Sequence, residues 1–362
     1  MAMKNESVAP LGRTLLVGCG YRGLQDLALL VGKDIRCDPE TITVVDRNPH
    51  HLAWCSKNHP RVRVTESLDV ALADRPAVVV ITTPTLEHFG VFRRALACRV
   101  PALFVEKPLV SLKDLDPLSA IVGDARIGVG YPVNFSGVLG SLFGFMREQA
   151  LVAREIRTLW AEDLLTDPFS SLGDLEDQAT PPLCLALSII ALNQEIRHLS
   201  VRAALSDLPV VGRKPPRRPP QEDAPTVKTS TTTSQVALDI TTDRFGELLV
   251  VSQSSSIASA PEHWVEVNLA DAQGNLQYIA RIQFDHKGED CLWLHTANDL
   301  TLKHRWLSQS CEELAEQLRA FLAYAAGGER DPRLVTYELG ARMVEIVRQA
   351  LESDRVGCRL RV

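Results

Sequence analysis

The sequence predicts an N-terminal α/β domain with a doubly wound parallel sheet, followed by a β-rich second domain. Short apolar runs alternate with helix-compatible stretches over residues 12–132, and a glycine-rich turn follows the first run. After residue 227 the pattern changes to the alternation of half-buried strands. The length of 362 residues also exceeds what one ordinary hydrophobic core serves, which favours two domains.

Six apolar runs predict the strands of the parallel sheet, because a strand buried on both faces is apolar throughout. They span residues 14–17, 41–45, 62–65, 77–82, 102–105 and 126–129. Helices are predicted between them at 24–31 and 87–97, and a further one through residue 72 with Ser67 as its N-cap. The predicted first domain is therefore residues 1–132.

The predicted second domain covers residues 133–362. A strand is expected at 155–162 and a buried helix at 182–192. The Pro-rich segment 209–226 cannot form a helix or an inner strand, so we expect an exposed loop there. Strands are expected at 227–240, 247–256, 264–270, 276–283 and 291–294, with hairpin turns at 243–246 and 271–274. Two amphipathic helices, 311–326 and 337–353, form the closing segment 310–353.

Composition excludes several classes of protein. The net charge of −6 argues against a nucleic acid as the main partner. No apolar run reaches the roughly 18–20 residues of a membrane span, and the first residues lack a signal peptide's apolar segment. The eight cysteines include no C-x-x-C pair, so we expect reduced thiols in a cytoplasmic protein and no metal site.

The segment Gly18-Cys19-Gly20-Tyr21-Arg22-Gly23 predicts a dinucleotide site, because it follows a strand and opens a helix. Its first glycine permits a tight turn, its second lets the backbone approach a pyrophosphate, and its third allows close packing of helix on strand. Asp46 ends the second strand, where it can accept hydrogen bonds from ribose hydroxyls and repel a 2′-phosphate. Arg47 follows and could soften that preference, so the choice between NAD and NADP stays open.

Two more segments follow strands at the edge where a doubly wound sheet binds its ligand. Thr82, Thr83 and Pro84 are expected to shape a loop against the cofactor, and His88 is either a packing residue or a catalytic group. Glu106-Lys107-Pro108 follows the fifth strand. A lysine beside a nicotinamide can polarise a substrate oxygen or nitrogen, or transfer a proton if burial lowers its pKa.

Together these motifs resemble the Gfo/Idh/MocA oxidoreductase family. GCGYRG, VVDRNP, ITTPTLEH and FVEKPL occur in the family's order and spacing, and GVGYPVNFS (128–136) resembles its next segment. The helical segment from residue 320 to 353 resembles its C-terminal pattern. The resemblance implies a Rossmann domain, then an α+β domain with an open antiparallel sheet that forms homodimers or homotetramers. It also implies hydride transfer between NAD or NADP and a small-molecule substrate.

The sequence departs from the family at its second catalytic segment. The family has an Asp and a His four residues apart on one helix, and the best-placed segment here is 181–193. Ala186 replaces the Asp, Ile190 the His, and Asn193 a later Asp. Alanine and isoleucine cannot transfer protons.

Other polar residues are candidates for the missing chemistry. Tyr131 is a candidate catalytic residue beside Lys107 and His88, and Asn134, Glu162 and Asn193 are candidate substrate contacts. Asp163 and His198 are weaker candidates. Alternatively, a reaction that needs a single proton donor, as imine reduction can, would leave Lys107 sufficient.

Two functions remain open. The first is an NAD(P)-dependent oxidoreductase acting on a carbonyl, alcohol or imine, with Lys107 as proton donor or substrate orienter. The second is a dinucleotide-binding protein without redox turnover, such as a sensor or an assembly subunit.

Overall fold

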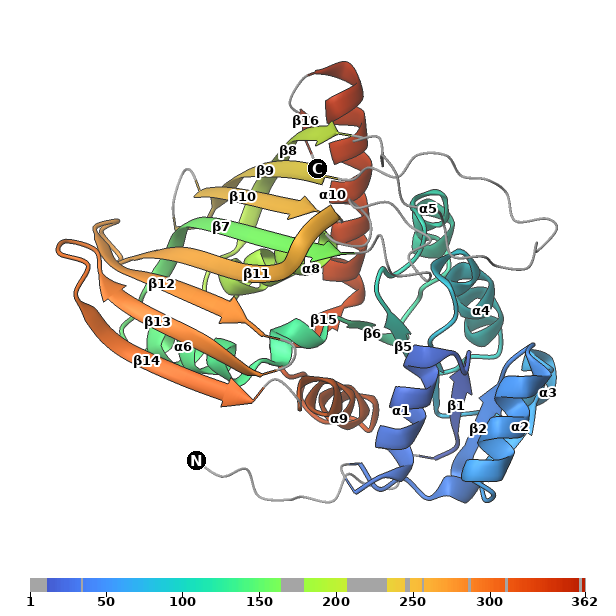
Figure 1. The fold of residues 1–362 in the computed structure, drawn as a ribbon. Coiled ribbons are helices and arrows are strands. Elements are labelled where there is room, and N and C mark those ends of the chain that lie inside the picture. The colour runs from blue at the N-terminus through green and yellow to red at the C-terminus, as the bar shows by residue number, and fades with distance from the viewer. Residues whose placement is uncertain are drawn as a thin grey trace. The chain divides into compact units, whose positions relative to one another are not determined.

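The computed structural model describes residues 12–33, 35–163, 179–206, 233–244, 248–255, 257–285, 288–309, 312–357 and 360–361. The predicted Pro-rich loop at 209–226 lies outside the described residues. The chain forms two compact units (Figure 1). The first comprises Met1–Phe145, Asp285–Cys291 and Trp306–Glu345, and the second comprises Met146–Phe284, Leu292–Arg305 and Ile346–Val362.

The first unit contains a seven-stranded sheet in the order β15-β6-β5-β4-β1-β2-β3. Its neighbours pair in parallel except β15, which lies antiparallel to β6. The strands are β1 (Thr14–Val17), β2 (Ile42–Val45), β3 (Arg63–Thr65), β4 (Val78–Ile81), β5 (Ala102–Glu106), β6 (Arg126–Gly130) and β15 (Val335–Thr336). All six predicted strands are confirmed, and the strand order reverses between β1 and β4, where such sheets bind ligands.

Helices connect these strands. They are α1 (Tyr21–Val31), α2 (Pro49–Asn58), α3 (Leu68–Ala73), α4 (Thr85–Ala97) and α5 (Leu115–Ser119). Ser67 caps α3 as predicted, because its hydroxyl accepts a hydrogen bond from the Val70 amide at 3.3 Å. The α2 helix was not predicted. Its N-terminus carries the local signals of a helix start, with Asn48 as N-cap and Pro49 in the first position.

The first unit takes in more of the chain than the predicted 1–132. It gains α9 (Glu313–Ala325) and β15, which are far away in sequence. Phe321 of α9 is fully buried, and its ring centroid lies 5.2 Å from that of Phe104 on β5. A Cβ atom at Gly128 would lie 2.7 Å from the Phe321 ring, so this glycine makes room for it. Local sequence patterns cannot show such a long-range contact.

The second unit contains a nine-stranded sheet in the order β14-β13-β12-β11-β7-β10-β9-β8-β16. Its strands are β7 (Val152–Asp163), β8 (Ile196–Ser206), β9 (Thr233–Thr242), β10 (Leu248–Ser255), β11 (Ile257–Ala270), β12 (Leu276–Phe284), β13 (Glu289–Thr296), β14 (Leu302–Gln309) and β16 (Leu360–Arg361). Most neighbours are antiparallel as expected, but β7 and β10 pair in parallel. We did not predict β8, β14 or β16.

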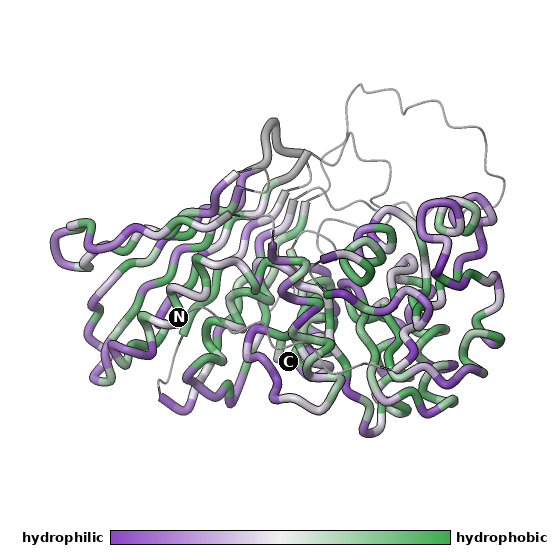
Figure 2. Tube along the Cα trace, turned by 90° about the horizontal axis from the view of Figure 1, so that it is seen from below, coloured by the Kyte–Doolittle hydropathy of each residue, from purple (hydrophilic) through white to green (hydrophobic). Residues whose placement is uncertain are grey.

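The predicted helices of this part of the chain are also present, as α8 (Thr180–Ala191) and α10 (Tyr337–Val356), while α6 (Gly137–Glu148) was not predicted. The α8 helix packs against β7 and β10. The predicted turn at 271–274 is confirmed, since the Gly274 amide donates to the Asp271 carbonyl at 3.0 Å. Hydrophobic stretches follow the strands of each sheet, and hydrophilic ones mark many of the loops (Figure 2).

The Phe321 contact gives a stability prediction. Phe321→Ala should lower the free energy of unfolding by about 3–5 kcal/mol, because it leaves a cavity between α9 and the parallel sheet. Urea unfolding followed by circular dichroism measures this. Leu86→Ala is the control, since Leu86 is exposed on α4. Equal effects of the two substitutions would contradict the packing role.

A pair of neighbouring carboxyl groups, Asp290 and Glu313, gives a pH prediction. Asp290 is buried and accepts a hydrogen bond from the Ser136 hydroxyl at 2.6 Å. Burial, and then the hydrogen bond with Asp290, raise the pKa of Glu313 to about 9. Because this pKa is raised, the stability contribution of protonated Glu313 is complete below its unfolded pKa and is lost as the pH rises towards 9.

Glu313→Gln should therefore flatten the decrease in unfolding free energy between about pH 5 and pH 9, since glutamine can donate to Asp290 without titrating. Chemical unfolding at several pH values measures the slope. An unchanged slope in the variant would show that another group causes the decrease.

Candidate functional site

The glycine turn between β1 and α1 is tightly packed against the end of β4. Gly18 has a φ of +94°, and a Cβ atom there would lie 2.8 Å from the Thr82 carbonyl carbon. A Cβ atom at Gly23 would lie 2.1 Å from the Gly18 oxygen. The Thr82 hydroxyl donates to that same oxygen at 2.6 Å. Neither glycine can be replaced without moving backbone, so the turn needs glycine at both positions.

The middle glycine differs, and it shows that the turn fits a dinucleotide. A Cβ atom at Gly20 would meet nothing within 4 Å, so the backbone is open to a ligand there. No side chain caps the N-terminus of α1, which carries the positive end of the helix dipole. The nearby Thr83 hydroxyl oxygen is buried without a hydrogen-bond partner. These features fit a pyrophosphate group at the helix start.

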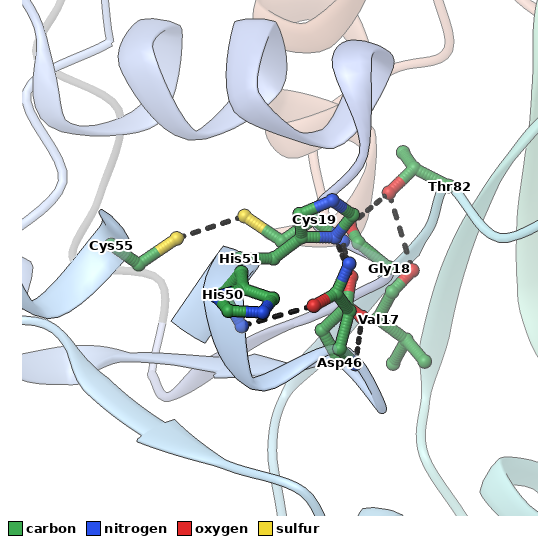
Figure 3. A network of polar contacts seen from close by, with 9 residues as sticks. Val17, Gly18, Cys19, Asp46, His50, His51, Cys55 and Thr82 are labelled. Atoms are coloured by element: carbon green, nitrogen blue, oxygen red, sulfur yellow. Dashed lines mark hydrogen bonds and ion pairs between the residues drawn. The ribbon is translucent and has the colours of Figure 1, made fainter. Parts of the chain in front are cut away.

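Asp46 follows β2 and is the centre of a polar network (Figure 3). It accepts hydrogen bonds from the Cys19 amide at 2.6 Å, the Asn48 amide at 2.7 Å and His51 Nδ1 at 3.1 Å. Burial by itself raises the pKa of Asp46, but these three donors outweigh it and lower that pKa below its usual value. Asp46 is therefore an ionised acceptor, and three of its roughly four acceptor positions are in use.

Arg47 and Cys19 are neighbours of Asp46, but their side chains contact other residues than Asp46. The Arg47 guanidinium lies 2.6 Å from Glu87 of α4, although Arg47 is largely exposed. The Cys19 thiol points to Cys55 of α2, with 2.9 Å between the sulfur atoms (Figure 3). Burial raises the pKa of both thiols. Cys19 thus contributes its backbone amide to the network.

The Glu106-Lys107-Pro108 segment lies at the carboxyl end of β5. Glu106 Oε1 is 2.6 Å from Nη2 of Arg22, which belongs to the first turn of α1. A Cβ atom at Gly130 on β6 would lie 2.5 Å from that same oxygen, so Gly130 makes room for the carboxylate. The Lys107–Pro108 peptide bond is cis, and Lys107 is half-buried. The glycine turn and this segment are thus joined by an ion pair.

His88 of α4 is buried between two loops. Its Nε2 lies 2.9 Å from the Thr83 oxygen, and its Nδ1 lies 3.0 Å from the Pro108 oxygen. Burial lowers the pKa of His88, whereas the contacts with these carbonyl oxygens raise it. Both ring nitrogens face backbone carbonyl groups. This geometry favours the packing interpretation of His88 over the catalytic one.

The remaining candidates follow β6, follow α8 or belong to β7. Tyr131 and Asn134 are both buried in the first unit, and the Asn134 amide donates to the Arg333 carbonyl at 3.3 Å. Asn193 follows α8 in the second unit and donates to the Leu151 carbonyl at 2.5 Å. Glu162 belongs to β7, but its side chain is outside the described residues. Their roles in catalysis or substrate binding stay predictions.

Sequence reasoning missed two residues of this network, Asp26 and His51. Asp26 is fully buried on α1, its carboxylate has no hydrogen-bond partner, and Arg22 Nε lies 3.6 Å from Oδ1. The signal for it was present, because Asp26 occupies the apolar face of α1 beside Leu27 and Leu30. His51 follows Asp46 by five residues and gives no such signal.

Among the described residues, no group of three or more His, Cys, Asp or Glu side chains could hold a metal ion. The six described cysteines are free thiols. Within the same residues, no helix combines the length and apolar composition needed to cross a bilayer.

The whole fold is similar to those of several solved structures, among them two dehydrogenases. UDP-N-acetylglucosamine 3-dehydrogenase GnnA from Acidithiobacillus ferrooxidans is 16% identical with a TM-score of 0.72, covering 95% of this chain and 98% of that one. Levoglucosan dehydrogenase in complex with NADH is 17% identical with a TM-score of 0.73, covering 97% and 99%. GenD2 from gentamicin A biosynthesis, in complex with NAD, is 17% identical with a TM-score of 0.71, covering 100% and 99%.

No curated protein sequence matches this chain. Residues 13–126 match a family model described as an oxidoreductase family with an NAD-binding Rossmann fold. That model is the one for the Gfo/Idh/MocA proteins, so the family resemblance of the four motifs within these residues is confirmed. The identities to solved structures of 16–17% agree with a divergent member. The chain is accordingly an oxidoreductase whose NAD-binding Rossmann domain, residues 13–126, matches the model of the Gfo/Idh/MocA family.

Proposed function

We propose that this chain transfers a hydride between NAD and a small-molecule carbonyl, alcohol or imine, with Lys107 as the proton donor or substrate orienter. The observation that carries this proposal is the position of Lys107. It directly follows β5, at the same sheet edge as the glycine turn, and the preceding Glu106 is ion-paired to Arg22 of that turn. A nicotinamide bound there would supply or accept the hydride.

The residues of the glycine turn and its neighbours would hold the dinucleotide. The backbone around Gly20 would face the pyrophosphate, and Asp46 would accept a ribose hydroxyl at its remaining acceptor position. His51 is the only side-chain donor among the three partners of Asp46, so it can rotate to free a second position. The ionised Asp46 favours NAD, because a 2′-phosphate beside it would be repelled.

The proposed substrate class depends on the proton-transfer groups of the chain and on its structural neighbours. Structural neighbours include dehydrogenases of a nucleotide sugar and of levoglucosan, which favour a polar small molecule. Ala186 and Ile190 offer no second proton-transfer group, so a reaction served by one lysine is favoured. Assembly through the C-terminal sheet into a homodimer or homotetramer and a cytoplasmic location stay predictions.

Lys107→Ala tests the reaction. We expect turnover to fall by about 10²- to 10⁴-fold, the usual contribution of a general acid, while NADH binding persists. Turnover is followed by the near-ultraviolet absorbance of reduced nicotinamide across a panel of ketones, aldehydes and imines. Lys113→Ala is the control, because Lys113 is an exposed lysine six residues further along.

Each contrary outcome has its own meaning. Tight NADH binding without turnover of any substrate would favour the alternative, a dinucleotide-binding protein that acts as a sensor or assembly subunit. Turnover that is equal in wild type and Lys107→Ala would refute the role of Lys107 but not the reaction.

Asp46→Asn tests the cofactor preference. The Cys19 and Asn48 amides donate to different carboxylate oxygens, so asparagine keeps an acceptor oxygen for one of them and loses the negative charge. The ratio of the NADPH to the NADH dissociation constant should fall by about tenfold, or about 1.4 kcal/mol. Fluorescence titration with both dinucleotides measures it. Glu87→Gln, which releases Arg47, provides a comparison, and an unchanged ratio in Asp46→Asn would contradict the role of the charge.

A further inference from the structure

Arg22, Asp26 and Glu106 form a nearly enclosed charge cluster beneath the glycine turn. Arg22 Nη2 lies 2.6 Å from Glu106, and its Nε lies 3.6 Å from Asp26 one turn along the same helix. The exposed fractions of the three side chains are 25% for Arg22, 16% for Glu106 and 0% for Asp26. Two carboxylates thus share one guanidinium with little access to water.

The charge of this cluster does not balance when every group is ionised. One cation and two anions leave a net charge of −1, and an uncompensated charge away from water is costly. The partners are also unequal, because Glu106 has a 2.6 Å hydrogen bond from Arg22 whereas both Asp26 oxygens have none. Protonation of Asp26 therefore removes the excess charge at the smallest cost in hydrogen bonds.

The charged groups around Asp26 agree with this account. Arg22 on its own helix and Glu106 on β5 are the ionisable groups that act on it. Burial has the largest effect on the pKa of Asp26 and raises it. Arg22 lowers this pKa and Glu106 raises it, and the result is a pKa of about 7. Lys107 follows Glu106 in the chain, and His88 lies within electrostatic reach of Glu106.

We propose that Arg22 and Asp26 are positioning residues for the Glu106-Lys107-Pro108 segment, and that Asp26 takes up a proton when the dinucleotide binds. The proton uptake rests on the proposed function only in its dinucleotide site, whereas the positioning role rests also on the proposed reaction. Arg22 holds the Glu106 carboxylate over Gly130, which fixes the chain direction at Lys107. A pyrophosphate at the start of α1 adds negative charge beside Arg22, and this favours the protonated form of Asp26.

The sign of the pH dependence follows from linkage. A ligand that raises the pKa of Asp26 binds more tightly to the protonated protein, so NADH affinity is highest at low pH. It should decrease as the pH rises through 7, by at least about threefold between pH 6 and pH 8.5. The proton comes from solvent, so buffer must release one proton for each one taken up.

Isothermal titration calorimetry of the full chain with NADH, and separately with NADPH, tests the proton uptake. Titrations near pH 7 in two buffers with different ionisation enthalpies give the number of protons bound. We expect a positive fraction of a proton for wild type and a value near zero for Asp26→Asn. Asp69→Asn is the matched control and should resemble wild type, because Asp69 lies in an exposed ion pair with Arg94.

Arg22→Met and Arg22→Lys test the positioning role. The methionine variant should lower kcat at saturating NADH, and lysine should restore part of it, because a cation can again hold Glu106. A change in the free energy of unfolding alone, with kcat retained, would overturn the positioning role.

The outcomes separate this inference from the proposed reaction. NADH binding without proton uptake in wild type would overturn the inference and leave the reaction intact. Proton uptake without turnover of any substrate would contradict the reaction and the positioning role, and would leave the proton uptake by Asp26 standing. Absence of binding by both dinucleotides would overturn both. The wild-type measurement decides the proton uptake even if Asp26→Asn does not fold.

Discussion

The close approach of the Gly18 backbone to the end of β4 is the constraint on which the functional edge depends. The Gly18 amide donates to Val45 of β2 at 2.8 Å, and Thr82 donates to Gly18 from the end of β4. The same turn carries the Cys19 amide to Asp46 and Arg22 to Glu106. One six-residue turn therefore connects the ends of β1, β2, β4 and β5. A side chain at Gly18 or Gly23 would disturb all of these links, which is why the glycine motif predicts so much of the site.

Asp46 and Asp26, two carboxyl groups near this edge of the sheet, have different surroundings. Asp46 is stabilised as an anion by three donors, two of them backbone amides, and so it can face a cofactor while ionised. Asp26 has a single distant cation and no hydrogen bond, and burial dominates its pKa. Two aspartates of the same domain thus differ because of hydrogen bonding. The sequence places Asp46 after a strand and Asp26 within a helix, but it does not show the hydrogen bonds that separate them.

The sequence predicted what depends on local pattern and missed what depends on distant contacts. Buried strands such as β4 are continuous apolar runs, and Ser67 is a local cap, so both could be found. The packing of Phe321 on Phe104 joins residues more than two hundred positions apart, and β15 has only two residues. The parallel pairing of β7 with β10 was missed because alternation in a strand does not specify the direction of its neighbour.

The α8 helix covers the segment where the family resemblance expects a second set of proton-transfer groups. Ala186 and Ile190 occupy the positions where the family resemblance expects an acid and a histidine, and both are 0% exposed. Their neighbours Leu183, Leu187 and Ile189 are also fully buried, so α8 serves as a core helix against β7 and β10. An ionised acid at such a position would cost several kcal/mol without a partner. The side chains present at these two positions contribute to packing. In the proposed function, Lys107 would then carry any proton transfer by itself, next to the Glu106 carboxylate that is ion-paired to Arg22.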